Sequence, residues 1–258
     1  MIHKLAYVDP KAKIGKNVTI DPFTMVTKDV EIGEGTCIGS NVTIMDGARI
    51  GKNCKIFPGA VISAIPQDQK FVGEESLAIV GDNTTIREYV TINRGTKAKN
   101  KTIIGNNTLI MAYSHIAHDC IIGDNCILVN YVGLAGEVEI GDYAILGGAA
   151  LVHQFVRIGK HVMLGGGTKS RIDIPPYIKA DRDPVSYVGV NAIGLRRRGF
   201  TTEKITEIQD MYREIYQKNQ NNSQALNEIE KSFPASDEKN EVLNFFKSTS
   251  RGIIGSGI

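Results

Sequence analysis

The chain has 258 residues, with 30 Lys and Arg against 28 Asp and Glu, so its formal net charge at pH 7 is only +2. This balance gives no sign of a nucleic-acid or other polyanion partner. Hydrophobic residues make up 42% of the chain and charged residues 22%, which is typical of a globular protein and excludes a chain that is disordered throughout.

Nothing in the chain resembles a targeting or membrane segment. The N-terminus, MIHKLAYVDP, has no apolar run behind its charged residues, and the longest uncharged apolar stretch, Tyr143 to Val152, is far shorter than the ~20 residues of a membrane helix. Four cysteines are too few for a disulfide framework in a chain of this length. We therefore expect an unexported protein in a reducing cytoplasm, with no membrane span.

An aliphatic residue recurs every six positions along most of the chain. The series runs without a miss from Ile2 to Ile62 and from Ile104 to Leu164, with Val80, Ile86 and Ile92 between them. Neither the helical period of 3.6 nor plain strand alternation gives a period of six. Short strands separated by tight turns do, with the aliphatic side chain inside. Three hexads then predict a triangular coil of 18 residues, whose equivalent positions stack ~4.8 Å apart.

Two segments leave the period and are expected to project from the prism as loops. They are residues 63–79 (SAIPQDQKFVGEESLAI) and 97–103 (KAKNKTI). Loops on a rigid scaffold often carry function. Pro175 and Pro176 remove donors from a strand ladder, so the repeat domain is predicted to span residues 1–176.

Residues 177–258 are predicted to hold a connecting segment and a small α-helical domain. Thr201 is the predicted N-cap of its first helix. After it, apolar and aromatic residues fall at helical spacing at Ile205, Ile208, Met211, Tyr212, Ile215 and Tyr216. Two shorter helices are expected around Gln224 to Lys231 and Asp237 to Lys247.

The repeat also places candidate catalytic residues at one edge of the prism. His118, Gly136 and Gln154 each follow a repeat aliphatic by two positions and lie 18 residues apart, so they should stack on successive coils. A histidine beside the unhindered N–H of a glycine provides a general base for a hydroxyl and an oxyanion donor for a carbonyl, as acyl transfer requires. Asp119 follows directly and is suited to orient the imidazole.

Five segments resemble the UDP-N-acetylglucosamine O-acyltransferase family of hexapeptide-repeat enzymes: QDQK (67–70), HIAHDC (115–120), GGAALVHQF (147–155), HVMLGGG (161–167) and GVNAIGLRRRGF (189–200). The resemblance implies a mainly β protein, a left-handed parallel β-helix with a C-terminal α-helical domain, assembled as a homotrimer with active sites between subunits. It implies transfer of an R-3-hydroxyacyl chain from acyl carrier protein to the 3-hydroxyl of UDP-N-acetylglucosamine, the first step of lipid A biosynthesis. The protein would need no cofactor beyond the phosphopantetheine of its carrier substrate.

The resemblance further implies roles for single residues. His118 would be the general base, Asp119 its partner and Gly136 the oxyanion donor. Glu137 and Ile193 depart from the family pattern, which more often has His and an acidic residue there. Gly166 would bound the acyl groove. The substrate-binding residues would be Asp68, Lys70, His115, His153, Gln154, Asn191, Arg197 and Arg198.

Three other interpretations stay open on the sequence. His115, His118 and His153 map to one patch and give the ligand count of a zinc enzyme resembling the γ-class carbonic anhydrases, which share the β-helix and the trimer. An acyltransferase acting on an already acylated UDP-glucosamine is expected to carry a domain ahead of its repeats, whereas here the repeat starts at Ile2. A purely structural β-helix does not explain the stacked polar edge. Cysteines at the small inward positions, expected to be packing residues, weaken the zinc interpretation; they are Cys54, Cys120 and Cys126.

Overall fold

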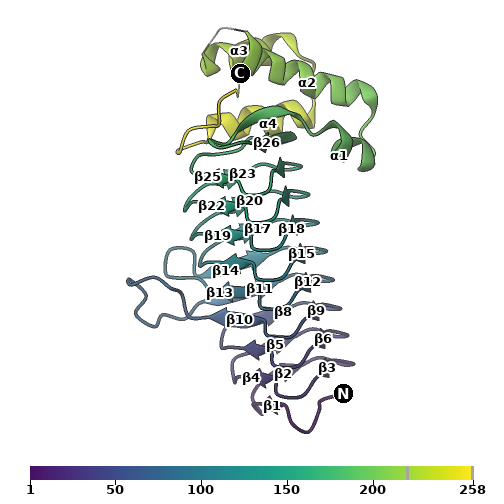
Figure 1. The fold of residues 1–258 in the computed structure, drawn as a ribbon, viewed down its shortest axis with the longest axis vertical. Coiled ribbons are helices and arrows are strands. Elements are labelled where there is room, and N and C mark those ends of the chain that lie inside the picture. The colour runs from purple at the N-terminus through teal and green to yellow at the C-terminus, as the bar shows by residue number, and fades with distance from the viewer. Residues whose placement is uncertain (219–220, 257–258) are drawn as a thin grey trace.

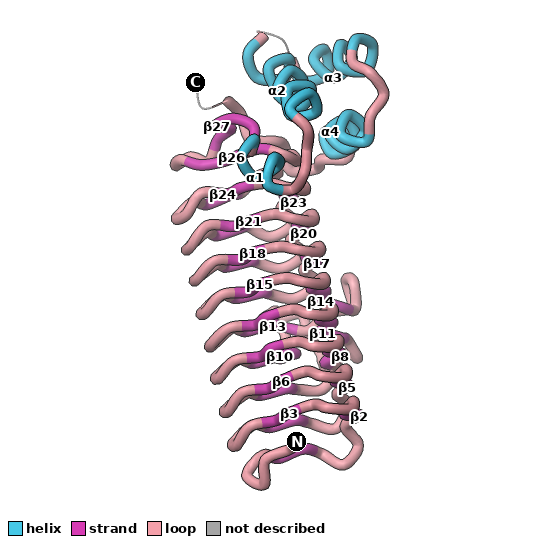
Figure 2. The backbone as a smooth tube through the Cα atoms, turned by 90° about the vertical axis from the view of Figure 1, so that its right-hand side faces the viewer, coloured by secondary structure: helices cyan, strands magenta, loops and turns pink. Residues whose placement is uncertain are grey.

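The chain forms a parallel β-helix closed at one end by helices, and this confirms the fold class expected from the period of six (Figure 1). The structure is a computed structural model that describes residues 1–218 and 221–256. Most strands are only two residues long, and they stack in three sheets, called here faces 1, 2 and 3 (Figure 2). The edges are named by the faces that they join in chain order: the 1–2 edge, the 2–3 edge and the 3–1 edge.

Each face is a ladder of parallel strands, apart from β27 at the end of face 3. Face 1 contains β1 (Tyr7–Val8), β4 (Met25–Val26), β7 (Thr43–Ile44), β10 (Val61–Ala64), β13 (Thr91–Asn93), β16 (His115–Ile116), β19 (Gly133–Leu134), β22 (Leu151–Val152) and β25 (Lys169–Ser170). Face 2 contains β2 (Lys13–Ile14), β5 (Glu31–Ile32), β8 (Ala48–Ile50), β11 (Leu77–Val80), β14 (Lys101–Ile104), β17 (Ile121–Ile122), β20 (Glu139–Ile140) and β23 (Arg157–Ile158). Face 3 contains β3 (Thr19–Ile20), β6 (Cys37–Ile38), β9 (Lys55–Ile56), β12 (Thr85–Ile86), β15 (Leu109–Ile110), β18 (Ile127–Leu128), β21 (Ile145–Leu146), β24 (Met163–Leu164), β26 (Ile178–Asp181) and β27 (Ser186–Val190).

The core is the column of repeat aliphatics inside these faces. Ile116 pairs with Leu134, and Leu134 with Val152, each 18 residues further along the chain, so the predicted stacking is confirmed. From Ile20 onward these side chains are at most 4% exposed. Burying each one stabilises the fold by about 1.5–3 kcal/mol. Ile2 is 47% exposed, because it belongs to the first coil and nothing packs below it.

Both predicted loops exist, with shifted boundaries, and both leave the prism at the 1–2 edge (Figure 1). The first covers residues 65–76, because β10 continues to Ala64 and β11 already begins at Leu77, where Leu77 pairs with Lys101. The second covers residues 94–100 and so begins earlier than expected. The two loops lie on neighbouring coils and enclose the same stretch of the edge.

One more strand joins the prism beyond residue 176, the predicted end of the repeat domain. β26 pairs in parallel with β24 on face 3, and β27 then returns antiparallel to it. Pro175 and Pro176 lie at the corner before β26, outside any strand, so their missing N–H groups interrupt no ladder.

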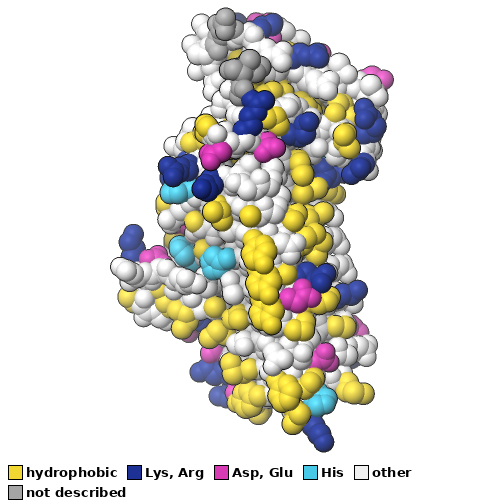
Figure 3. All heavy atoms as spheres, in the orientation of Figure 1, with side chains coloured by type: hydrophobic (Ala, Val, Ile, Leu, Met, Phe, Trp, Pro, Cys, Tyr) yellow, Lys and Arg dark blue, Asp and Glu magenta, His cyan; other side chains and the backbone are white. Residues whose placement is uncertain are grey.

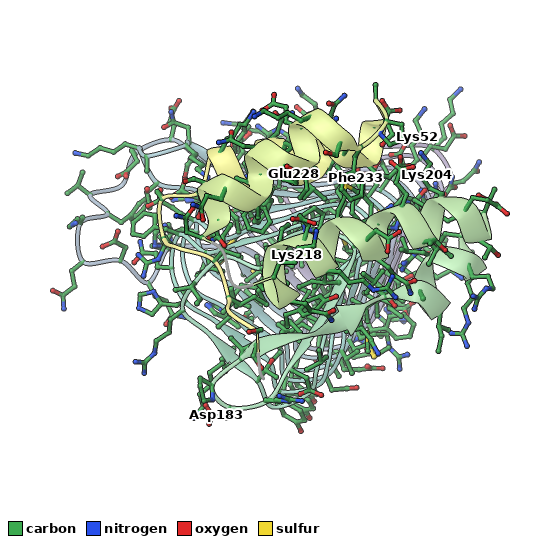
Figure 4. The ribbon with its side chains drawn as sticks, turned by 90° about the horizontal axis from the view of Figure 1, so that it is seen from above. Lys52, Asp183, Lys204, Lys218, Glu228 and Phe233 are labelled. Carbon is green, nitrogen blue, oxygen red and sulfur yellow. The ribbon has the colours of Figure 1, made fainter. Side chains whose placement is uncertain are left out.

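In the described part of the chain, four helices follow: α1 (Ala192–Arg197), α2 (Thr202–Gln217), α3 (Asn222–Ser232) and α4 (Asp237–Lys247). The N-cap of α2 is Thr201, as predicted, and its side chain accepts from the Lys204 N–H. The two shorter helices were expected, whereas α1 was not. Figure 4 looks down on this end, where the helices lie across the prism. The buried Tyr212 hydroxyl donates to the Pro176 carbonyl at 2.6 Å and joins α2 to the last coil.

Within the described residues, no helix has both the length and the apolar composition needed to cross a membrane.

Candidate active site

The centre of the site is a histidine–carboxylate pair at the 1–2 edge, directly after β16. His118 Nδ1 lies 2.8 Å from Asp119 Oδ2, and the two side chains are 11% and 0% exposed. An Asp68 oxygen from the first loop lies 3.9 Å from Nε2 on the other side of the ring. A carboxylate that accepts from Nδ1–H leaves Nε2 as the atom that takes up a proton.

The second loop encloses the carboxylate of this pair. Asp119 Oδ2 accepts from the Thr96 hydroxyl at 2.7 Å, and its two oxygens accept from the Thr96 N–H at 3.0 and 3.1 Å. Lys99 N–H adds a bond of 3.2 Å. Asp119 itself has φ +61°, a left-handed backbone that Asp tolerates better than most residues. The sequence reasoning missed Thr96, because a threonine in a short polar loop carries no pattern.

Gly136 stacks on the imidazole from the next coil, as the spacing of 18 predicts. A Cβ at this position would lie 2.5 Å from His118 Cε1 and 2.6 Å from Nε2, so only glycine lets the ring rest against this backbone. Among the described residues, the Gly136 N–H has no protein acceptor, while its carbonyl accepts from Phe155 N–H. Glu137, a departure from the family pattern, is half-buried and donates its N–H to the His118 carbonyl.

The first loop and β16 bring three further predicted residues to this edge. Asp68 Oδ1 accepts from the Lys70 N–H at 2.9 Å, which fixes the turn, while the Lys70 side chain is exposed. His115 Nδ1 lies 2.7 Å from Thr91 Oγ1. Burial lowers the pKa of His115, so this ring is neutral near pH 7.

His153 and Gln154, predicted to lie two coils above His118, are approached by Arg251 from the C-terminal tail. His153 is exposed and Gln154 is half-buried at the 1–2 edge. Arg251 Nη2 lies 3.3 Å from His153 Nδ1, and Arg251 Nε donates to the Arg171 carbonyl. Asp173 holds this tail segment by accepting from Thr249 Oγ1 and Ile254 N–H. No sequence pattern indicates that residue 251 returns to this edge.

Asn191 lies on a different edge of the prism from His118. Its side chain caps α1 by accepting from Gly194 N–H at 3.2 Å, and it donates to the carbonyl of His161 at the 2–3 edge at 2.9 Å. Ile193, the other departure from the family pattern, is 64% exposed on α1.

Arg197 and Arg198 follow Asn191 to the 2–3 edge. Arg197 is exposed. Arg198 donates to the Tyr143 carbonyl at 2.9 Å and lies 5.4 Å from the centre of that ring. Beside them, His161 stacks between Tyr143 and Tyr177. Burial and the nearby Arg198 charge lower the pKa of His161 to about 4, so its ring stays neutral. One chain therefore does not bring these arginines to His118.

Gly166 lies at the third edge, between β24 and β25. Two hexads beyond Gln154 amount to two corners of the triangle, so the shared offset does not mean a shared edge. A Cβ at Gly166 would be 3.1 Å from the Gly148 carbonyl oxygen, and φ is not positive there. The same 3–1 edge carries exposed, stacked rings with centroids 5.2 Å apart, at Tyr89, Tyr113 and Tyr131.

The inward cysteines pack as predicted. Cys54, Cys120 and Cys126 are fully buried, and burial raises the pKa of Cys120 and Cys126 to about 12. In residues 1–218 and 221–256, no three His, Cys, Asp or Glu side chains are grouped so as to hold a metal ion. The Nδ1 atoms of His115 and His118 are each paired with a neighbouring side chain.

Family models match three parts of the chain. Residues 173–254 match "Udp N-acetylglucosamine O-acyltransferase; Domain 2", residues 101–136 match the bacterial transferase hexapeptide, and residues 1–106 match the GMPPB C-terminal domain.

Whole-length relatives are also close. An acyl-(acyl-carrier-protein)–UDP-N-acetylglucosamine O-acyltransferase from Chlorobium phaeobacteroides is 62% identical over 97% of this chain and 96% of its own. The crystal structure of a UDP-N-acetylglucosamine acyltransferase from Bacteroides fragilis has a TM-score of 0.97 at 53% identity, covering 98% of this chain and 100% of that one. The Francisella novicida enzyme has a TM-score of 0.97 at 41% identity, covering 100% and 95%. The chain therefore belongs to the UDP-N-acetylglucosamine O-acyltransferase family.

Proposed function

We propose that this protein transfers an R-3-hydroxyacyl chain from acyl carrier protein to the 3-hydroxyl of UDP-N-acetylglucosamine, the first step of lipid A biosynthesis. The observation that supports this most is the buried His118–Asp119 pair with the Gly136 backbone against its ring, in a chain 62% identical to a relative of that name. Four free thiols fit a reducing cytoplasm, where we place the reaction.

The chemistry follows from the positions of these groups. His118 Nε2 takes the proton of the sugar hydroxyl while that oxygen attacks the thioester carbonyl carbon. Asp119 stabilises the imidazolium that forms, and the Gly136 N–H donates to the developing oxyanion. When the tetrahedral intermediate collapses, the carbon–sulfur bond breaks, and the imidazolium returns its proton to the thiolate of the carrier. The protein needs no cofactor for these steps.

Substrate binding is assigned to the residues around the pair. Lys70, exposed on the first loop, suits the diphosphate as a compact positive charge. Asp68, beside Nε2, suits a sugar hydroxyl. His115, His153 and Gln154 are assigned to contacts with the sugar nucleotide or with the acyl donor.

We propose that the protein assembles as a homotrimer, because the residues assigned to catalysis and to sugar-nucleotide binding lie on two different edges of the prism. Asn191, Arg197 and Arg198 belong to the 2–3 edge, whereas His118 belongs to the 1–2 edge. Three prisms around a threefold axis bring the 1–2 edge of each chain against the 2–3 edge of the next, so every active site is shared by two subunits.

Mixing two inactive variants tests this arrangement. His118→Ala and Arg198→Ala chains, denatured and refolded together, are expected to recover activity, because about a quarter of the interfaces then combine an intact His118 with an intact Arg198. The measurement is transferase rate for the mixture against each variant refolded alone. If the mixture shows only the average of the two separate rates, both residues act within one subunit and the shared site is wrong.

The acyl groove is assigned to face 1, which connects the 1–2 edge with Gly166 at the 3–1 edge. Gly166 follows His118 by 48 residues, which is about 2.7 coils or about 13 Å along the prism. Gly166→Met should shift the preferred donor toward shorter hydroxyacyl chains, since each methylene excluded from an apolar groove costs about 0.8 kcal/mol. The measurement is kcat/KM across donor lengths. An unchanged length profile in a folded protein would show that the groove ends elsewhere.

The overall activity is tested by incubating the protein with UDP-N-acetylglucosamine and a panel of hydroxyacyl carrier proteins. The expected result is a sugar nucleotide heavier by one hydroxyacyl group, together with free carrier thiol. No product from any donor, with zinc bound stoichiometrically in the purified protein, would instead favour the carbonic anhydrase-like enzyme.

A further inference from the structure

We propose that Thr96 is a positioning residue for catalysis, which fixes the Asp119 carboxylate toward His118 and sets how strongly it polarises the ring. The proposal rests on the function proposed above, in which His118 is the base. It makes the loop of residues 94–100 part of the catalytic apparatus, although no residue of that loop has a place in the reaction steps.

The contacts of Thr96 are concentrated on this one carboxylate. Its hydroxyl and its N–H both reach Oδ2, the oxygen that accepts from His118 Nδ1. Both residues are removed from solvent, with Thr96 6% and Asp119 0% exposed. Hydrogen bonds to an ionised group are about twice as strong as neutral ones, and burial strengthens them further. The position of Asp119 Oδ2 therefore depends on Thr96.

The loop itself fixes the direction in which the hydroxyl donates. Thr96 Oγ1 accepts from the Ala98 N–H at 3.2 Å, which closes a turn inside the loop. With that lone pair engaged, the hydroxyl proton points toward Asp119 Oδ2 at 2.7 Å. Valine has the same shape as threonine and removes both bonds, whereas serine keeps both.

The loop is anchored at two further points. Glu74, on the first loop, accepts from the Lys97 N–H at 3.0 Å and from the Val72 N–H at 3.0 Å. Lys99 Nζ pairs with Glu139 Oε1 at 2.8 Å. Glu74 therefore joins the loop that holds Asp119 to the loop that places Asp68 beside Nε2. The two carboxylates on either side of His118 are held by one connected pair of loops.

Loss of the Thr96 hydroxyl is expected to shift the pH dependence of the rate in one direction. A carboxylate with one donor fewer interacts more strongly with the imidazolium, which favours the protonated ring of His118 over the neutral one. The rate is carried by the neutral ring, and the acid limb of the kcat/KM profile therefore moves to higher pH. The freed carboxylate also holds the ring less well, and this lowers kcat on the plateau.

The experiment compares three variants. Thr96→Val is expected to lower kcat about tenfold and to move the acid limb to higher pH, with the KM for UDP-N-acetylglucosamine changed little. Thr96→Ser is expected to restore both properties to near wild type. Thr84→Val is the matched control. Thr84 is also a buried threonine that donates to a carbonyl, that of Gly105, and accepts from an N–H, that of Thr108, but it lies at the 2–3 edge. It is expected to lose thermal stability without a change in the pH profile.

The outcomes test the role of Thr96 separately from the proposed function with His118 as the base. If Thr96→Val and Thr84→Val show the same kcat and the same acid limb, Thr96 is only structural and the inference is overturned. If Thr96→Val does not fold, Thr96→Cys gives the same comparison, because a thiol keeps the size and donates weakly; an unshifted acid limb there also overturns it. His118→Ala is measured in parallel, and full activity in that variant overturns the proposed function itself.

Discussion

His118→Ala is expected to lower turnover by about 10²- to 10⁴-fold, the typical value of a positioned general base. The imidazole of His115, on β16, is held by Thr91 through its Nδ1 and is not expected to take over the proton transfer. Substrate affinity should change little, because the ring is needed for proton transfer and not for holding the diphosphate. The measurement is kcat and KM under saturating carrier substrate.

The fold should survive this change, although the histidine is less open than its place in the repeat suggests. A residue at this offset points outward, yet the loops leave only 11% of the His118 side chain exposed. Asp119 loses one partner on mutation and keeps the donors of Thr96 and Lys99. We expect a cost of about 1–3 kcal/mol in the free energy of unfolding. Turnover within a few-fold of wild type would refute the assignment of the base.

Gly136→Ala is expected to be nearly as damaging, for a steric reason. The added Cβ occupies space 2.5 Å from His118 Cε1, so the imidazole must swing away from Asp119. A displacement of about 1 Å at a reacting group can cost 10²-fold, and we expect at least about that loss in kcat. The backbone accepts alanine, because Gly136 is not among the glycines with positive φ.

A second glycine provides the control for this substitution. At Gly255, in the C-terminal tail, a Cβ meets nothing within 4 Å, so Gly255→Ala should keep wild-type kcat. The double variant Gly136→Ala with His118→Ala should be no slower than His118→Ala alone, since both changes disable the same ring. Independent, multiplying losses would show that Gly136 acts apart from His118.

The spacing of six predicted the faces, the register and the vertical alignment of His118 with Gly136, because a regular repeat fixes where each residue stacks. It did not predict what covers that edge. Thr96 and Glu74 act through loops whose paths are set by single hydrogen bonds, and Arg251 arrives with a tail that leaves the repeat altogether. Such contacts leave no periodic trace in a sequence.

The family resemblance assigns to one site several residues that the structure places on different edges of the prism. The resemblance implies that Asn191, Arg198 and Gly166 all contact substrate. Of these three, only Gly166 lies within the repeat, so the period of six assigns an edge to Gly166 alone. The structure puts Asn191 and Arg198 at the 2–3 edge and Gly166 at the 3–1 edge. A prediction from one chain could not join them; in the homotrimer proposed above, neighbouring chains bring these edges together.

The pairing of repeat aliphatics on each face is preserved even where the number of residues in a coil changes. Ile62 pairs with Ile92 and Ile92 with Ile116, so successive coils on face 1 advance by 30 and then by 24 residues before the regular 18 returns. The repeat aliphatics pair in register on both sides of each insertion, and a register shift in β10, between Ile62 and Ala64, lies where the chain leaves the strand for the first loop. A longer loop adds only the slowly growing entropy of closing it. One residue inserted within a strand would instead turn every later side chain of that coil to the opposite side. Insertions at this edge therefore leave the columns of aliphatic residues aligned, whereas an insertion inside one of the two-residue strands would not.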